Sequence, residues 1–430
     1  MALAVAAVVP AAAATSAGAF LAVAQVGVVP VVAAALLLFL LLIPLRALII
    51  VAVAAMFFSR LSVSVADVDF RPEHLVTFVM LLRVALLGRL SVTRSQANVL
   101  IALVAFVVVN VASTYAHSLD RAASARVIAW LVVDVALFVV FCSITHHREL
   151  ILRTGIVAAM AASALAMIQS LAATFAGIDA GVQVDASTGG VAAYGVSHEA
   201  NILASSIAVW ATIGAVIRWP ARKWQYLLHV LAVGGILAAQ TRAALVGYFL
   251  AIAVVSVRDR RVPRVVATVS ALVVGWLAIG QTLALPQNYD ALRLKLTHVV
   301  DFESGNGAVR AQVWEQAVQD LQIETIATGL GTNTFGQRHV EVTRPDTATP
   351  GYLGNLPLQI LYDAGLVGVM LVVCIAAAVV RRTSVGTWLP IGLAYGVASI
   401  ATSFVWFGLT WTLLALALGD GYSRRRPAAW

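Results

Sequence analysis

Residues 97–114 read ANVLIALVAFVVVNVAST, a run without a charged side chain. A helix that crosses a bilayer needs about 20 mostly apolar residues, and runs of this kind recur along nearly the whole chain. They are continuous and do not alternate with a period of two, which indicates helices and not the strands of a barrel. With 61% hydrophobic and 11% charged residues, the composition excludes a soluble protein. The sequence predicts an all-α, polytopic membrane protein.

The apolar runs predict about 12–14 membrane-spanning helices. Lys and Arg gather in the short connections, which the positive-inside rule assigns to the cytoplasm. This explains the net charge of +8 without a nucleic-acid partner, and it places both termini in the cytoplasm. On the outer face it leaves the segments 59–73, 115–124, 177–199 and 286–354. The apolar runs fall at about 4–24, 28–45, 46–58, 74–88, 97–114, 125–145, 150–176, 200–217, 225–240, 242–257, 264–285, 355–380, 386–401 and 403–419.

Residues 286–354 form the only long polar stretch of the chain. Such a length far exceeds what a connection between two spanning helices needs, and long ordered loops are usually functional. We therefore expect an extracytoplasmic cap over a membrane-embedded site. The chain then divides into a transmembrane helix bundle at 1–285, the cap at 286–354, and C-terminal transmembrane helices with a basic cytoplasmic tail at 355–430.

Two arginines are candidate anion ligands. The segment 309–323, VRAQVWEQAVQDLQI, has apolar residues at helical spacing and predicts an amphipathic helix in the cap. Arg310 falls in its first turn, where free N–H groups and a guanidinium suit a phosphate; the alternative is an ordinary solvent-facing arginine. Arg242, in AAQTRAALVG, lies at the outer end of a spanning run. It either snorkels to the interface or faces a polar cavity, because a lone charge in the membrane is costly.

The stretch TGLGTNTFG at Thr328–Gly336 combines closely spaced glycines with small polar residues. Such loops allow positive φ and a close approach of the backbone, as anion-binding nests require. They also occur where the chain simply turns a corner. We take Gly329, Gly331 and Asn333 as candidates for binding phosphate.

Candidate acid–base residues lie near the outer ends of two spanning runs. His198 and Glu199, in GVSHEAN, can act together as a general base near neutral pH. Both can equally be solvated loop residues, with Asn201 capping or packing the helix. Asp363 is a carboxylate inside a spanning run and is a site hypothesis by default. Its expected partner is one of the two arginines.

Asn355 is followed after nine residues by Gly365 and Gly368, and these glycines are expected to let helices pack closely. The chain has no Gly-rich nucleotide-binding motif. Both cysteines lie inside apolar runs, which favours neither a disulfide nor a metal site. We therefore expect no metal and no cofactor.

Together these stretches resemble the O-antigen ligase and O-antigen polymerase superfamily of bacterial membrane glycosyltransferases. The resemblance is carried by HEAN, TRAALVG, NGAVRAQVW with TGLGTNTFG, and Asn-x9-Gly-x-x-Gly. It implies transfer of a glycan from a polyprenyl-pyrophosphate carrier to an acceptor hydroxyl, on a lipid or on another glycan, at the outer face of the bacterial plasma (inner) membrane. It implies Arg242 and Arg310 as ligands of the pyrophosphate, with neither nucleotide sugar nor obligatory metal. The partners would be the lipid-linked oligosaccharide or polysaccharide donor, the acceptor and membrane lipids.

The sequence departs from this family at one position. The ligases carry a histidine directly before the asparagine of the last motif, where this chain has Gly354. Its role could pass to His198, Glu199, His339 or Asp363, or the protein could be a polymerase with another acceptor.

Two further classes stay open. A transporter or flippase of lipid-linked cargo would fit the number of spans, and it would use charged residues within apolar runs, such as Arg83 and Asp134. A scaffold for envelope assembly with a degenerate site would fit the glycine at position 354.

Overall fold

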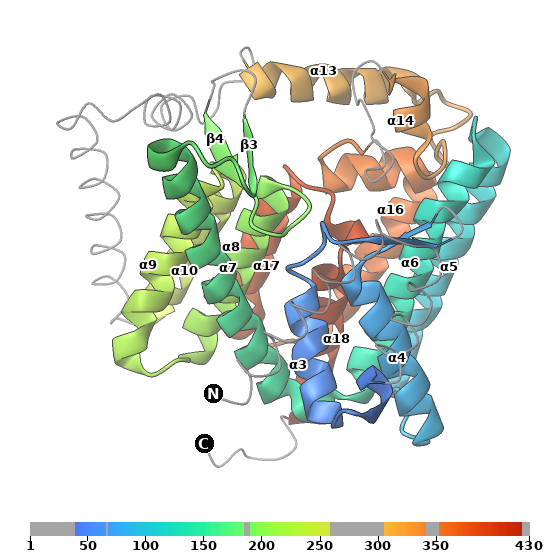
Figure 1. The fold of residues 1–430 in the computed structure, drawn as a ribbon. Coiled ribbons are helices and arrows are strands. Elements are labelled where there is room, and N and C mark those ends of the chain that lie inside the picture. The colour runs from blue at the N-terminus through green and yellow to red at the C-terminus, as the bar shows by residue number, and fades with distance from the viewer. Residues whose placement is uncertain (1–38, 66–67, 185–189, 259–304, 341–351, 424–430) are drawn as a thin grey trace, which may run out of the picture.

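The computed structural model describes residues 39–65, 68–184, 190–258, 305–340 and 352–423. Within these ranges the protein is a bundle of spanning helices with one further helix lying across its end (Figure 1). Five described helices are long and apolar enough to cross a membrane. The expected all-α, polytopic membrane protein is confirmed. The predicted runs 4–24 and 264–285 and both chain termini lie outside the described residues.

The helices follow the predicted apolar runs closely. The long ones are α5 (Arg94–His117), α6 (Arg121–Ser143), α7 (Arg148–Ala176), α8 (Ala200–Ile217) and α16 (Leu356–Arg382). Shorter helices complete the bundle: α3 (Leu45–Ala55), α4 (Pro72–Leu86), α9 (Arg222–Ala238), α10 (Arg242–Arg258), α17 (Val385–Ser399) and α18 (Gly408–Ser423). Their inner faces share one apolar core, so the bundle is held by packing along its whole length.

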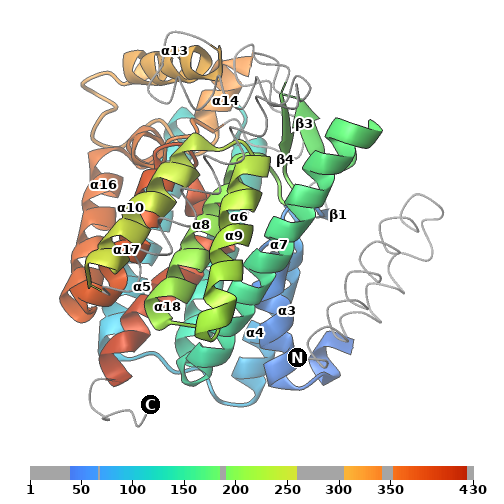
Figure 2. The ribbon, with the colours of Figure 1, turned by 90° about the vertical axis from the view of Figure 1, so that its left-hand side faces the viewer.

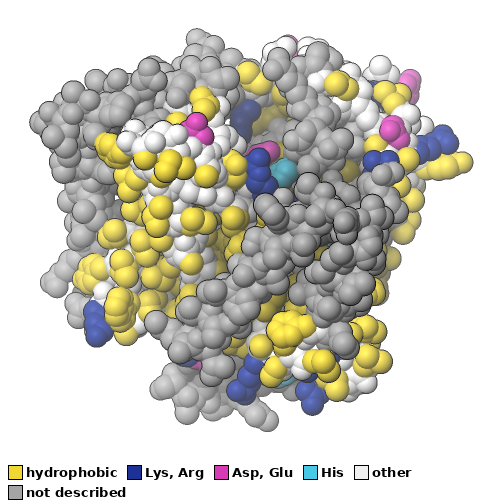
Figure 3. Space-filling view, viewed as in Figure 1, with side chains coloured by type: hydrophobic (Ala, Val, Ile, Leu, Met, Phe, Trp, Pro, Cys, Tyr) yellow, Lys and Arg dark blue, Asp and Glu magenta, His cyan; other side chains and the backbone are white. Residues whose placement is uncertain are grey.

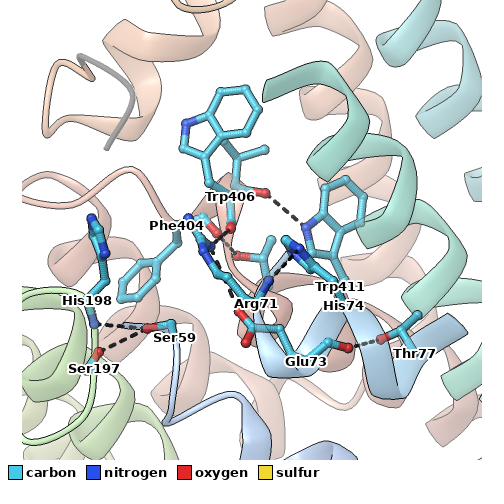
Figure 4. A network of polar contacts seen from close by, with 12 residues as sticks. Ser59, Arg71, Glu73, His74, Thr77, Ser197, His198, Phe404, Trp406 and Trp411 are labelled. Carbon is cyan, nitrogen blue, oxygen red and sulfur yellow. Dashed lines mark hydrogen bonds and ion pairs between the residues drawn. The ribbon is translucent and has the colours of Figure 1, made fainter. Parts of the chain in front are cut away.

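Two connections carry polar groups into the bundle. Between α3 and α4, strand β1 (Val63–Val65) pairs antiparallel with β2 (Val68–Phe70). Between α17 and α18, residues 400–407 form a loop that contains the 3-10 helix η2 (Phe404–Trp406). Side chains from both connections meet in Figure 4. A second small hairpin, β3 (Val182–Val184) with β4 (Val191–Ala193), joins α7 to α8 at the end of the bundle (Figure 1).

The cap contains α13 (Gly305–Asp320) and the short α14 (Thr334–Arg338). Figures 1 and 2 show α13 lying crosswise over the bundle. It buries Val313 and Ala317 in a small core that is separate from the core of the bundle and is shared with α14 and α16. Val309 and Val318, which the periodicity assigned to the apolar face, remain 50% and 57% exposed. The buried stripe is therefore narrower than expected.

The start of α13 differs from the prediction. The helix begins at Gly305 and not at residue 309, because the glycine-rich segment before it joins the helix. Arg310 therefore stands in the second turn, and the free N–H groups of the first turn lie before it. Segments 286–304 and 341–351 of the predicted cap lie outside the described residues.

The connections alternate between the two ends of the bundle. Those between α7 and α8 and between α9 and α10 lie at the end covered by α13, and the connection between α8 and α9 lies at the opposite end (Figures 1 and 2). Arg218 and Lys223 belong to that opposite end. Which end faces the cytoplasm stays a prediction.

Candidate active site

Arg242 is the first residue of α10 and follows a tight turn from α9. Gln240 adopts a left-handed backbone with φ 51, and its Nε2 donates to the Val191 carbonyl oxygen of β4 at 3.1 Å. This bond fixes the turn to the hairpin beneath the cap. The start of a helix leaves N–H groups unpaired and carries a partial positive charge. The charge of Arg242 therefore adds to an end that already favours anions.

Arg310 reaches from α13 to the loop between α17 and α18. Its Nη1 donates to the Ala401 carbonyl oxygen at 2.9 Å, and Asn201 Nδ2 donates to the same oxygen at 3.4 Å. One carbonyl thus joins the cap to α8. The N-cap position of α8 belongs to Glu199, so Asn201 packs the helix and does not cap it.

Arg310 lies near Tyr352, Glu199 and Arg242. Burial lowers the pKa of the Arg310 guanidinium; Tyr352 and Glu199 raise this pKa, and the positive charge of Arg242 lowers it. The two arginines therefore come close together although they belong to different helices. We call Arg242, Arg310, Glu199 and Tyr352 the arginine cluster. Figure 3 shows basic, acidic and histidine side chains together in a hollow below the cap.

Glu199 and His198 precede α8, and the segment before the helix is held by serines. The His198 amide donates to Ser59 Oγ at 3.0 Å, and the Ser59 and Ser197 hydroxyls are 3.4 Å apart (Figure 4). These bonds attach the segment to the connection between α3 and α4. Of the predicted pair, the structure brings Glu199 to the arginine cluster.

His339 lies toward the far end of the cap. Its Nε2 is 2.9 Å from Asp320 Oδ2, and the Tyr362 hydroxyl donates to the same oxygen at 2.7 Å. From Arg310 to Asp320 a helix rises about 15 Å at 1.5 Å per residue. His339 therefore joins α14, α13 and α16, and the structure does not bring it to the arginine cluster.

Among the described residues Asp363 forms no ion pair with an arginine, contrary to the prediction. Its Oδ2 accepts a hydrogen bond from Gln359 Nε2 at 2.9 Å, because residues four apart share a helix face. Gln359 Oε1 in turn accepts from the Leu353 amide at 2.8 Å. The carboxylate thus supports the side chain that attaches the end of the cap to α16.

The glycine-rich loop and the last motif meet in the structure. Gly365 interrupts α16 with φ 63 and ψ −164, which frees backbone groups on both sides of it. The segment before α14 fills this interruption. It makes four backbone hydrogen bonds with α16: Leu330 N to Tyr362 O (2.6 Å), Gly331 N to Asp363 O (3.1 Å), Leu366 N to Ile326 O (2.9 Å) and Val367 N to Ala327 O (3.2 Å).

This arrangement gives Gly329 and Gly331 a packing role in place of the expected anion nest. Their φ angles are +78 and +94, and a Cβ at these positions would lie 2.5 Å from Gly365 N and 2.6 Å from Thr114 Cα. The loop amides donate to protein oxygens, including Thr332 N to Thr114 Oγ1 at 2.9 Å. The glycines therefore permit contact between backbones and leave these amides engaged with the protein.

The remaining motif residues also shape helices. Asn333 adopts φ 63 at the start of α14. Asn355 is the N-cap of α16, and its Oδ1 accepts from the Leu358 amide at 3.1 Å. A Cβ at Gly368 would lie 2.3 Å from the Cβ of Ala364, so this glycine supports close packing around the interruption of α16.

The geometry thus gathers Arg242, Arg310, the glycine loop and the last motif at one end of the bundle. Residues 227–373 match the O-antigen ligase family. This O-antigen ligase segment is about a third of the chain, and it confirms the resemblance to the superfamily of ligases and polymerases. No curated protein matches the chain. The protein is a membrane protein that carries an O-antigen ligase-type segment.

Sequence reasoning named Asp134 but missed the other members of a second polar site, which lies outside the O-antigen ligase segment. Arg71 is 3% exposed, and its Nη1 donates to the Trp406 carbonyl oxygen at 2.6 Å (Figure 4). Its guanidinium carbon is 4.5 Å from the ring centres of both Trp130 and Phe407. Glu73 forms an ion pair with it at 3.9 Å. The signal was the polar run Arg-Pro-Glu-His, which forms the N-cap and the first turn of α4; the prediction assigned its first three residues to an outer loop.

Two further buried groups complete this site. His74 Nδ1 accepts from the Arg71 amide at 3.5 Å, and Asp134, near the middle of α6, is fully buried. Within the described residues the carboxylate oxygens of Glu73 and Asp134 accept no hydrogen bond of ordinary geometry. We call Arg71, Glu73, His74 and Asp134 the deep cluster. No group of three or more metal-ligating side chains was found among the described residues.

Proposed function

We propose that this protein is an extracytoplasmic glycosyltransferase of the O-antigen ligase type. It would transfer a glycan from a polyprenyl-pyrophosphate carrier to an acceptor hydroxyl in cell-envelope polysaccharide assembly, as a ligase or as a polymerase of the same superfamily. The main support is the approach of Arg242 to Arg310 beside Glu199. Both arginines belong to the segment that matches the O-antigen ligase family.

The chemistry requires positive charge where the carrier leaves. When the acceptor oxygen bonds to the anomeric carbon, the bond from that carbon to the pyrophosphate oxygen breaks and negative charge grows on the pyrophosphate. Preorganised donors at such a position lower the barrier by about 3 kcal/mol each. Two guanidiniums would also repel each other less with an anion between them. The start of α10 adds its partial positive charge to the same place.

The architecture suits a substrate with a lipid tail and a polar head. The apolar helices would keep the polyprenol in the bilayer, and α13 would lie over the sugar and pyrophosphate. The proposed reaction would take place at the outer face of the bacterial plasma membrane, with membrane lipids and a lipid-linked glycan as partners. The glycan or lipid acceptor would approach from below the cap, on the side of Glu199.

The proposal is tested by Arg242→Ala and Arg310→Ala in proteoliposomes supplied with lipid-linked glycan and acceptor from the source membranes. Each variant is expected to lose transfer at least about 100-fold, the typical loss for an oxyanion donor. Arg121→Ala is the matched control, because Arg121 starts α6 at the capped end and lies over Tyr115. Full transfer activity in both cluster variants would contradict the proposal.

The deep cluster favours a second candidate, a transporter or flippase of lipid-linked glycan. Charged groups at membrane depth often mark substrate pathways in transporters, and Asp134 lies halfway along a spanning helix. This candidate predicts movement of labelled lipid-linked glycan across proteoliposomes without a new glycosidic bond. It also predicts that Asp134→Asn, and not Arg310→Ala, abolishes that movement.

A further inference from the structure

The acceptor hydroxyl must lose a proton during transfer, and a group near the arginine cluster must take it. His339 is bonded to Asp320 beyond the far end of α13, and Asp363 is bonded to Gln359. Glu199 is the carboxylate whose negative charge raises the pKa of Arg310. The question is which group connects Glu199 to the acceptor.

Tyr352 has the position for this connection. Its hydroxyl oxygen is buried and makes no hydrogen bond of ordinary geometry within the described residues. A buried hydroxyl without a hydrogen bond is costly, and Glu199 is the group that interacts with this hydroxyl by hydrogen bonding and charge. Burial raises the pKa of Tyr352 well above its usual value, and the charge and hydrogen bonding of nearby Glu199 raise this pKa further. Tyr352 therefore keeps its proton and can donate it to Glu199.

The neighbouring residue fixes where Tyr352 lies. The Leu353 carbonyl oxygen accepts a hydrogen bond from Trp314 Nε1 at 3.0 Å, and Trp314 lies one helical turn after Arg310. The Leu353 amide donates to Gln359 Oε1 at 2.8 Å. Tyr352 is thus held between the helix that carries Arg310 and the start of α16.

Gly354 follows Tyr352 by two residues and carries no side chain. Gly354 has φ +62, and a Cβ built on it would meet nothing within 4 Å. Its position therefore offers no side chain to the reaction, while Tyr352, two residues earlier, places a hydroxyl beside Glu199 and Arg310.

We propose that Tyr352 and Glu199 together remove the proton from the acceptor hydroxyl, with Tyr352 as the group that contacts the acceptor. This inference rests on the proposed transferase function. The acceptor O–H bond breaks as its oxygen bonds to the anomeric carbon, and the pyrophosphate leaves with the electron pair of the broken C–O bond. The acceptor proton passes to the Tyr352 oxygen while the proton of Tyr352 passes to the Glu199 carboxylate. Glu199 then releases its proton to water.

The test compares Tyr352→Phe, Glu199→Gln and the double variant in the proteoliposome transfer assay. Tyr352→Phe and Glu199→Gln should each lower transfer at saturating donor about 100-fold or more, the usual range for general acid–base catalysis. The double variant should be no more than about threefold slower than either single one, because the two residues act on one proton. Multiplying losses would contradict the shared step.

Binding separates this role from a structural one. Polyprenyl diphosphate without a sugar should bind Tyr352→Phe as tightly as the wild type, because the arginines are intact. Tyr115→Phe, at the end of α5 and 69% exposed, should keep full transfer activity and serves as control. If Tyr352→Phe transfers normally while Arg310→Ala is inactive, the proton role is wrong and the transferase proposal survives. If Arg242→Ala and Arg310→Ala transfer normally as well, both proposals are wrong.

Discussion

Arg71 carries its charge into the packed interior of the bundle. Trp130 and Phe407 flank the guanidinium, the Trp406 carbonyl oxygen accepts its hydrogen bond, and Glu73 supplies an opposite charge. Because the Trp406 carbonyl belongs to the loop between α17 and α18, the same side chain also fixes the conformation of that loop. Removing one partner of a buried ion pair leaves the other charge buried and uncompensated. The resulting loss of stability is larger than the net stabilisation that the intact pair supplies.

We predict that Arg71→Ala lowers the free energy of unfolding by about 3–5 kcal/mol, the usual cost of breaking a buried ion pair. Thermal unfolding in detergent, followed by tryptophan fluorescence, measures the effect. The double variant Arg71→Met with Glu73→Gln removes both charges and should be destabilised less than Arg71→Ala. An Arg71→Ala protein as stable as the wild type would show that the deep cluster does not hold the fold.

The glycines next to α16 differ in what surrounds them. A Cβ at Gly329 would meet the backbone of Gly365 at 2.5 Å, whereas a Cβ at Gly354 would meet nothing. Both have positive φ, so backbone strain from an alanine destabilises the protein by about 1–2 kcal/mol at either position. We predict that Gly329→Ala destabilises the protein well beyond this amount, and that Gly354→Ala stays within it. Equal melting temperatures for the two variants would contradict the packing role of the loop.

At the scale of elements, the cap is attached to the bundle at several points. Asp320 accepts from Tyr362 and is paired with His339. Gln337 on α14 accepts from the Leu119 amide and donates to the Asp120 carbonyl oxygen, each at 3.0 Å. These bonds lie away from the arginine cluster, so they set where the cap lies without taking part in the proposed chemistry.

We predict that Asp320→Ala loosens the cap and leaves the bundle intact. Both partners of its carboxylate would lose their bond, so limited proteolysis should cut within 305–340 faster than in the wild type. Glu315→Ala is the control, because the hydrogen bond that Glu315 makes among the described residues is to Gln319 on the same helix. Unchanged cleavage in Asp320→Ala would contradict the role of this contact.

The elements were predictable from the sequence where apolar length decides them. The apolar run at 97–114 forms α5, and the helical periodicity near Trp314 forms α13. A spanning helix shows in the sequence as a continuous apolar run, and an amphipathic helix shows as apolar residues at helical spacing. The interior of the site was not predictable to the same degree. The burial of Arg71 and the packing role of Gly331 depend on which distant part of the backbone each residue contacts. A local sequence pattern does not predict such contacts. The meeting of Arg242 with Arg310 came from the family resemblance and not from spacing.

At the scale of the whole molecule, orientation in the membrane decides which substrates the arginine cluster can meet. Asp179 follows α7 at the capped end, and Lys223 lies in the first turn of α9 at the other end. The distribution of Lys and Arg predicts that the capped end is extracytoplasmic.

We predict that a cysteine at Asp179 reacts with a membrane-impermeant maleimide in intact cells, whereas a cysteine at Lys223 reacts only after permeabilisation. Both substitutions are made in a chain whose own cysteines, Cys142 and Cys374, are replaced by alanine. The reverse labelling pattern would put the arginine cluster on the cytoplasmic side and exclude the proposed reaction there.

The central claim is that Arg242 and Arg310 hold one pyrophosphate between them. An experimentally determined structure of the protein with polyprenyl diphosphate in a lipid nanodisc tests it most directly. The expected result is a pyrophosphate within hydrogen-bond distance of both guanidiniums, with the polyprenol leaving the bundle sideways into lipid. A pyrophosphate bound at the opposite end of the bundle, or in contact with neither arginine, would contradict the claim.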